Sequence, residues 1–296
     1  MADTIKILGH RGVKNQPDLI ENTTPAFAHA LATADGLETD VVCSADGVPY
    51  LLHDTSIRII PHVVSWVTET WKKNVHPESY KIINGRDFRH MHSSEVDEIF
   101  LADGCTIPRL SELFILSARF QDKKILNLEL KAPWSADPVI KAIDEAERKG
   151  WIDRSQVILS SFDHHEMVYA QRIDPSIRTG LIFWQDSMRP CRLYPWSEKN
   201  LANALPVSIE NLGKEYIRQI LPDYFILPAQ GLTKIYSDAV KMEYSKSSYI
   251  VWTPGWEPLP EKNRALHEKL RDSAIGPRIA AVITNYPEEM ARLLRP

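Results

Sequence analysis

Acidic side chains occur at alternate positions in short apolar runs of the sequence. Glu38 and Asp40 lie two residues apart in LETDVVC, and Glu129 lies in KILNLELK. Side chains at alternate positions of a strand share one face, so each run presents its polar groups on one side. Three carboxylates in one cavity repel one another unless a cation neutralises them. Because these residues offer only oxygen ligands, we expect one divalent metal ion, Ca²⁺ or Mg²⁺ rather than zinc.

Basic and imidazole side chains accompany the acidic ones. His10 and Arg11 end the first apolar run, and Lys131 follows Glu129 on the same strand face. A basic pair beside a metal indicates an anionic substrate, most simply a phosphate ester. In SADGVPYLLHD, a tight turn and a return segment are expected to bring His53 back toward the acidic group. His10 and His53 can then exchange protons with the attacking and leaving oxygens of a phosphodiester.

Eight apolar runs alternate with helix-length amphipathic segments along the chain, a pattern typical of repeated βα units with a parallel sheet. An open doubly wound sheet usually has five or six strands, so eight favour an α/β fold of the (β/α)8 TIM-barrel type. Active sites of such barrels lie at the carboxyl ends of the strands, where these candidate residues occur. The expected strands cover residues 5–11, 37–43, 124–131, 156–161, 178–183, 223–228, 248–253 and 279–284.

The domain organisation follows from the spacing of these runs. A length of 296 residues fits one barrel domain over residues 1–296. Residues 54–107 interrupt the alternation, because this stretch separates the second strand region from the next helix and holds several aromatic and histidine positions. We expect it to form a small insertion after the second strand, on the rim of the barrel. The connection over 184–222 is also long and irregular.

Composition excludes several classes of protein. Lysine and arginine number 35 against 39 acidic residues, for a formal net charge of −4, and no basic block stands out, so nucleic acid is not an expected partner. Cys43, Cys105 and Cys191 are odd in number and far apart, which fits neither a disulfide framework nor a metal knuckle and favours a cytoplasmic location. We expect no export signal and no membrane span. The oligomeric state is not indicated.

Residues 9–54 resemble the glycerophosphodiester phosphodiesterase family through GHRG, ENTTPAF and LETDVVCSADGVPYLLHD, and NLELK, SSF and WT extend the likeness over nearly the whole chain. The resemblance implies metal-dependent hydrolysis of a small-molecule glycerophosphodiester to glycerol 3-phosphate and an alcohol. It also implies attack by the glycerol 2-hydroxyl and a cyclic phosphate that water later opens. The roles it implies are an acid–base pair of His10 and His53, metal ligands Glu38, Asp40 and Glu129, and phosphate contacts from Arg11 and Lys131.

Two segments depart from the family pattern. The sequence reads Trp252-Thr253-Pro254-Gly255 where the family usually shows Trp-Thr-x-Asn, and Thr284-Asn285-Tyr286-Pro287 where it usually shows Thr-Asp-x-Pro. We expect these changes to leave the metal site and the histidines intact and to alter the far wall of the mouth, and with it the head-group preference. Trp252 can still offer the glycerol moiety an apolar wall.

Two other functions fit the same residues. A phospholipase D-like or sphingomyelinase-like enzyme of the same superfamily would use them on a lipid with acyl chains. A non-catalytic phosphate-binding barrel would keep the site as a sensor. Each candidate residue taken alone has a structural explanation, and only their coincidence at strand ends, in the order that the barrel requires, favours catalysis.

Overall fold

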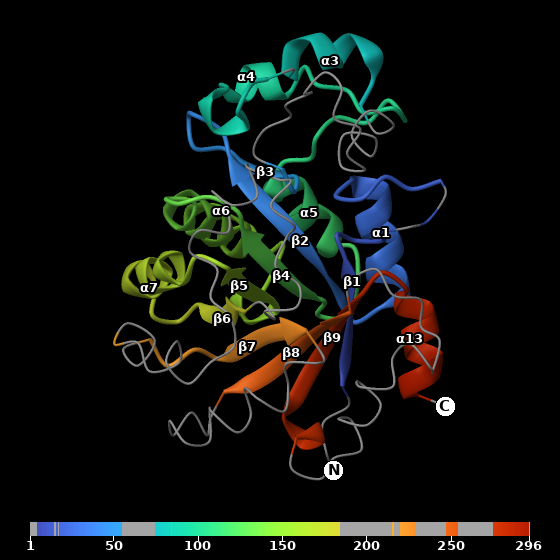
Figure 1. Ribbon diagram of the computed structural model, residues 1–296, viewed down its shortest axis with the longest axis vertical. Helices are drawn as coiled ribbons and strands as arrows, with labels where there is room; N and C mark the ends of the chain where they lie inside the picture. The colour runs from blue at the N-terminus through green and yellow to red at the C-terminus, as the bar shows by residue number, and fades with distance from the viewer. Residues whose placement is uncertain are drawn as a thin grey trace, which may run out of the picture.

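The computed structural model describes residues 5–14, 16, 18–54, 75–83, 85–183, 215, 220–228, 247–253 and 275–295. Eight parallel strands in this part of the chain form a closed ring, in the order β1-β9-β8-β7-β6-β5-β4-β2 with β2 paired to β1 (Figure 1). The predicted (β/α)8 barrel is therefore confirmed. The strands are β1 (Lys6–His10), β2 (Gly36–Cys43), β4 (Ile125–Leu130), β5 (Val157–Ser161), β6 (Arg178–Ile182), β7 (Tyr224–Pro228), β8 (Ser248–Thr253) and β9 (Ile279–Thr284).

Helices cover the outside of the ring (Figure 1). The helix α1 shows how they attach: it has Pro25 in its first turn, where the missing N–H costs nothing, and it buries Phe27 and Leu31. These side chains join one apolar cluster with the outward residues of the strands. The main helices are α1 (Thr24–Thr33), α5 (Leu110–Ser117), α6 (Ala136–Arg148), α7 (His164–Ile173) and α13 (Pro287–Leu294), with short 3-10 turns η2 (Arg154–Gln156) and η5 (Gly276–Arg278).

The inside of the barrel is divided by depth and by side. An apolar cluster fills its floor and continues along the strands β6 to β9, and its buried members are Leu8, Ile158, Ile182, Ile226, Ile250, Ala281 and Ile283. Polar and charged side chains lie nearer the carboxyl ends of β1, β2 and β4. Among the described residues, the mouth of the barrel therefore has a charged half and an apolar half.

The segment after β2 forms the expected return. Residues 44–47 make a turn closed by the N–H of Gly47 to the carbonyl of Ser44, and β3 (Pro49–Leu51) then pairs antiparallel with β2. Of the predicted insertion 54–107, residues 55–74 and 84 lie outside the described ranges. The rest contains α3 (Pro77–Ile83), η1 (Phe88–His90) and α4 (Ser93–Val96), which share an apolar cluster with Tyr50 and Leu52. Figure 1 shows α3 and α4 beyond the end of β2 and β3.

Two further expectations concern the rest of the chain. The connection over 184–222 falls almost entirely outside the described residues, which include only 215 and 220–222 of it. Among the helices that are described, none is both long enough and apolar enough to cross a bilayer.

Candidate active site

The three predicted carboxylates lie together at the barrel mouth. Asp40 on β2 is the direct register partner of Glu129 on β4, and Glu38 lies two residues before Asp40 on the same face. Each of the three offers a carboxylate oxygen, and these oxygens lie within 4.8 Å of one another. Glu38 and Asp40 are buried, and the Glu129 side chain is 13% exposed. Parallel strand pairing thus places the acidic residues as their sequence spacing predicted.

The acidic group is electrostatically strained. Burial, together with the neighbouring charges of Asp40 and Glu129, raises the pKa of Glu38 well above its usual range. For Asp40, burial opposes ionisation, but the ammonium of Lys131 and the guanidinium of Arg11 outweigh it and lower the pKa of that carboxyl.

Glu38 provides a test of whether these residues fit a metal. Its Oε2 accepts a hydrogen bond from the backbone N–H of Arg11 at 3.0 Å, whereas its Oε1 is buried and has no hydrogen-bond partner among the described residues. A buried acceptor without a partner is costly and rare. An oxygen-only donor set with one unsatisfied oxygen fits a hard divalent cation.

A tight turn at the end of β1 sets the position of Arg11. Arg11 and Gly12 both adopt left-handed backbone angles, with φ of +53° and +76°. The N–H of Gly12 donates to the carbonyl of Glu38, and the carbonyl of Arg11 accepts from the N–H of Asn22. A Cβ on Gly12 would lie 2.8 Å from the backbone carbon of Ala26, so this position requires glycine. Left-handed non-glycine residues are uncommon and gather at functional sites.

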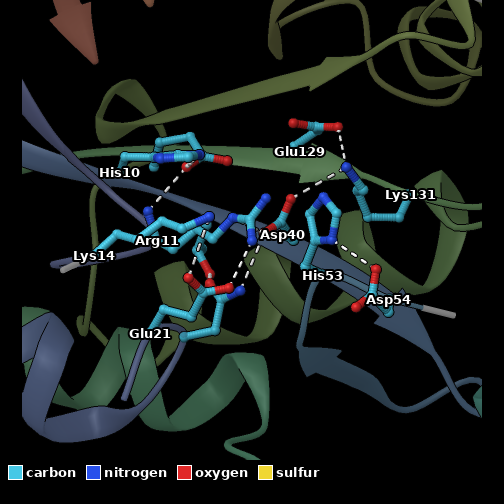
Figure 2. A network of polar contacts seen from close by, with 12 residues as sticks. His10, Arg11, Lys14, Glu21, Asp40, His53, Asp54, Glu129 and Lys131 are labelled. Atoms are coloured by element: carbon cyan, nitrogen blue, oxygen red, sulfur yellow. Dashed lines mark hydrogen bonds and ion pairs between the residues drawn. The ribbon is translucent and has the colours of Figure 1, made fainter. Parts of the chain in front are cut away.

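The Arg11 side chain joins two carboxylates. Its Nη1 lies 2.6 Å from Oε1 of Glu21 and its Nε lies 3.2 Å from Oδ2 of Asp40, with the side chain only 13% exposed (Figure 2). Lys14 lies 3.4 Å from the other oxygen of Glu21. Burial opposes ionisation of Glu21, but Arg11 and Lys14 outweigh it and lower its pKa to about 2. Arg11 therefore has a structural task, and its predicted phosphate contact stays a prediction.

This arrangement predicts a stability effect. Arg11→Met should lower the free energy of unfolding by about 3–5 kcal/mol, because it leaves Glu21 and Asp40 buried with less compensation. The double variant Arg11→Met/Glu21→Gln should recover part of the loss, since one of the uncompensated charges is gone. Denaturant unfolding measures both.

A surface pair provides the control for that experiment. Arg86→Met breaks the ion pair of Arg86 with Glu95, in which both side chains are about 40% exposed. It should lower the free energy of unfolding by at most about 1 kcal/mol. An Arg11→Met variant as stable as wild type would contradict the structural task assigned to Arg11.

Lys131 closes the charged cluster on the β4 side. Its Nζ lies 2.6 Å from Oε1 of Glu129 and 3.3 Å from Oδ1 of Asp40. Burial would lower the pKa of this ammonium, but the two carboxylates outweigh it and raise the pKa above its ordinary value. The cluster therefore keeps its cation charged.

The two histidines lie at the same mouth, each with a partner on Nδ1. Nδ1 of His10 lies 2.7 Å from Oδ1 of Asn285, and Nδ1 of His53 lies 2.8 Å from Oδ1 of Asp54. Burial and the cations Arg11 and Lys14 lower the pKa of His10 to about 3. In Figure 2, Asp40 is drawn between the two rings. Strand pairing extends to the His53 segment, because the N–H of Leu52 donates to the carbonyl of Asp40.

Asn285 makes a contact that the sequence did not indicate. The Thr-Asn-Tyr-Pro departure was expected to leave the histidines intact and to alter the far wall of the mouth, and its asparagine is the hydrogen-bond partner of His10. Asn285 follows the last residue of β9, and β9 pairs with β1 through Thr284 and Gly9. Only closure of the ring brings these residues together, although the position of Asn285 at a strand end was a usable signal. Pro254 and Gly255 of the other departure lie outside the described residues.

Three other polar side chains at the mouth had no predicted role: Lys14, Glu21 and Asn22. Asn22 has a left-handed backbone and links two strand residues, since its Nδ2 donates to Oδ2 of Asp40 and its Oδ1 accepts from the hydroxyl of Thr39. Glu21 and Asn22 belong to the ENTTPAF motif. This motif contributed to the family resemblance but did not indicate which residues the two side chains contact. Trp252 lies on β8 and packs against the inner apolar cluster, on the apolar half of the mouth.

Comparisons with known proteins bear on this site. The model of the glycerophosphoryl diester phosphodiesterase family matches residues 10–225. A glycerophosphodiester phosphodiesterase of Bacillus altitudinis is 29% identical over 179 residues, and one of Caldanaerobacter subterraneus is 29% identical over 185 residues. Each alignment covers 60% of this chain and 66% of the relative, slightly under two thirds of its length.

Solved structures share the fold. A glycerophosphodiester phosphodiesterase from Parabacteroides distasonis superposes with a TM-score of 0.66 at 16% identity, and an Oleispira antarctica phosphodiesterase superposes with a TM-score of 0.64 at 17% identity. Both alignments cover 99% of this chain and 98% of the other. The Oleispira structure is a complex with the product sn-glycerol-3-phosphate.

Proposed function

Because the chain belongs to the glycerophosphoryl diester phosphodiesterase family, we propose that it is an enzyme that hydrolyses glycerophosphodiesters to glycerol 3-phosphate and an alcohol. The observation that carries the proposal is the meeting of three carboxylates, two imidazoles and the cations Arg11 and Lys131 at one barrel mouth. The product bound in the Oleispira antarctica phosphodiesterase supports the choice of substrate.

The charges of the mouth fit such a substrate. Apart from the His53–Asp54 pair, four carboxylates face three cations there: Glu21, Glu38, Asp40 and Glu129 against Arg11, Lys14 and Lys131. With all of these groups ionised, the cluster carries one net negative charge, which a dication changes to one net positive charge. A phosphodiester carries one negative charge and would neutralise it.

In this proposal Glu38, Asp40 and Glu129 hold one divalent ion, Ca²⁺ or Mg²⁺. When bound, the ion would neutralise the acidic group and polarise a phosphoryl oxygen. Arg11 and Lys131 meet the phosphate, and Trp252 offers an apolar wall to the glycerol moiety. Arg11 can do so while it holds Glu21 and Asp40, because a guanidinium has five N–H donors.

The hydrogen bonds behind the histidines support an assignment of the acid and the base. The carbonyl oxygen of Asn285 can only accept, so the proton of His10 lies on Nδ1 and Nε2 is free to take one. His10 is then the base that deprotonates the glycerol 2-hydroxyl, which attacks phosphorus and gives the cyclic phosphate. His53, held at Nδ1 by Asp54, is left to protonate the departing alkoxide. In the second half the roles reverse, and water opens the cyclic phosphate.

A panel of diesters that differ only in the alcohol tests the function. We expect release of glycerol 3-phosphate from glycerophosphocholine, glycerophosphoethanolamine or glycerophosphoglycerol, measured by a coupled dehydrogenase assay. Intact phospholipid in vesicles should not be cleaved. Head-group release from intact lipid alone would favour the phospholipase D-like or sphingomyelinase-like alternative. Tight binding of glycerol 3-phosphate without turnover of any diester would favour the non-catalytic barrel.

The proposal extends to the setting of the enzyme. We place it in the cytoplasm as a single barrel domain with an insertion after the second strand. The cysteines Cys43 and Cys105 are free thiols in the structure, which is in keeping with a reducing compartment.

A further inference from the structure

Asn127 is a buried polar residue of the barrel that neither the acid–base pair nor the carboxylate group explains. It lies on β4, two residues before Glu129, and is 1% exposed. Its Oδ1 has no hydrogen-bond partner in the part of the chain that the structure describes. Buried side-chain oxygens are nearly always satisfied in folded proteins, so this one indicates a missing partner.

The surroundings of β4 place this side chain inside the barrel. Leu126 and Leu128 belong to the outer apolar cluster under the helices, whereas Ile125 packs against the inner cluster. Since side chains alternate along a strand, Asn127 shares the inner face with Ile125 and Glu129.

Strand register places Asn127 beside the carboxylates. Its Cα is the direct partner of Glu38 on β2, as Glu129 is the partner of Asp40. Neighbouring strands lie about 4.8 Å apart, so Asn127 and Glu38 are neighbours on the inner face of the barrel. Glu38 is also the residue whose Oε1 is buried without a partner. In the part of the chain that the structure describes, two neighbouring residues of the inner face therefore each have a buried oxygen without a hydrogen-bond partner.

Both oxygens are acceptors, so neither can satisfy the other while Glu38 is ionised. A cation between them would satisfy both. We propose that Oδ1 of Asn127 is a fourth protein ligand of the divalent ion held by Glu38, Asp40 and Glu129. The inference rests on the proposed function only in that it assumes this ion. A neutral amide oxygen adds coordination without adding to the repulsion among the three carboxylates.

A fourth oxygen also distinguishes between the two candidate ions. Ca²⁺ takes six to eight oxygens in flexible geometry and commonly accepts asparagine carbonyls, whereas Mg²⁺ keeps several waters and usually binds one or two carboxylates. Three carboxylates and an amide therefore favour Ca²⁺, and Asn127 should be part of the reason for that preference.

Isothermal titration of the chelator-stripped full-length chain with CaCl₂ and with MgCl₂ tests the inference without any activity assay. Asn127→Leu keeps the branched shape of the side chain but has no oxygen, and it should weaken Ca²⁺ binding about 10- to 100-fold. It should weaken Mg²⁺ binding less, so the Ca²⁺ to Mg²⁺ affinity ratio should fall. Asn127→Asp returns an oxygen and should restore Ca²⁺ binding to at least the wild-type level.

Ser117→Ala is the matched control, because this hydroxyl on α5 is also buried and unpartnered in the described ranges but lies outside the barrel. Its ion affinity should equal that of wild type. The inference fails if Asn127→Leu binds both ions as wild type does, if Asn127→Asp stays as weak as Asn127→Leu, or if Ser117→Ala weakens binding equally. A wild-type protein that binds neither ion overturns the proposed metal site as well. Diesterase activity is a separate measurement, so its absence in a protein that shows the predicted ion binding would overturn the proposed reaction alone.

Discussion

His10→Ala and His53→Ala should each lose at least about 100-fold in kcat on a glycerophosphodiester with an alkyl alcohol, because each would remove one of the two proposed proton transfers. Both variants should keep the fold, since the two side chains lie at the partly exposed mouth, 24% and 31% exposed, and not in any of the three apolar clusters. Steady-state kinetics with release of glycerol 3-phosphate measures the loss, and circular dichroism with thermal unfolding verifies the fold. His76→Ala, an exposed histidine next to α3, is the control and should have wild-type kcat.

The leaving group can separate the roles of the two histidines. In a p-nitrophenyl diester of glycerol phosphate the leaving group departs as a stable phenolate, so it needs little protonation. Release of p-nitrophenolate reports only the first half of the reaction. By this measure His53→Ala should recover much of its activity on this substrate, whereas His10→Ala should stay impaired on both substrates. The reverse pattern would exchange the acid and the base. Wild-type turnover by both variants would remove the acid–base pair altogether.

Removal of divalent ions should abolish turnover, and addition of Ca²⁺ or Mg²⁺ should restore it. The expected loss is nearly complete, because three carboxylates within 4.8 Å would otherwise repel the phosphodiester. Activity after dialysis against EDTA, followed by titration of each ion, measures the effect. Activity that survives thorough chelation would exclude the metal site.

Glu38→Gln separates ion binding from folding. The substitution removes a carboxylate whose pKa is raised by burial and by its acidic neighbours, so the ion-free variant should be at least as stable as ion-free wild type. It should nevertheless lose ion affinity and activity, because an amide is a weaker ligand for a hard cation. Glu95→Gln, at a surface ion pair, should change neither property. A Glu38→Gln variant that unfolds without added ion would mean that Glu38 has a structural role.

The sequence was informative wherever the structure depends on local periodicity. The alternation of Glu38 with Asp40, and of Asn127 with Glu129, already gave the inner face of two strands, and the structure confirms their pairing. The eight expected strands all occur, with ends that differ by at most one residue. Both results follow because strand period and helix amphipathicity are properties of neighbouring residues.

Contacts between distant parts of the chain could not be derived in this way. His10 and Asn285 are 275 positions apart, and their hydrogen bond depends on closure of the ring. The ion pairs of Arg11 with Glu21 and Asp40 depend on a left-handed turn that no periodicity encodes. The partners of Arg11 and His10 are thus the part of this site that could be identified only from the structure.

The pairing of β9 with β1 also determines when a nascent chain can form the hydrogen bond between His10 and Asn285. Its three acidic residues and both imidazoles precede residue 130 and leave the ribosome early, but Nδ1 of His10 receives its partner only after β9 has emerged. A chain arrested after β8 would hold the acidic group on paired strands and leave the His10 ring without its hydrogen bond. The His10 ring is therefore held in its final position only after β9 has joined the barrel.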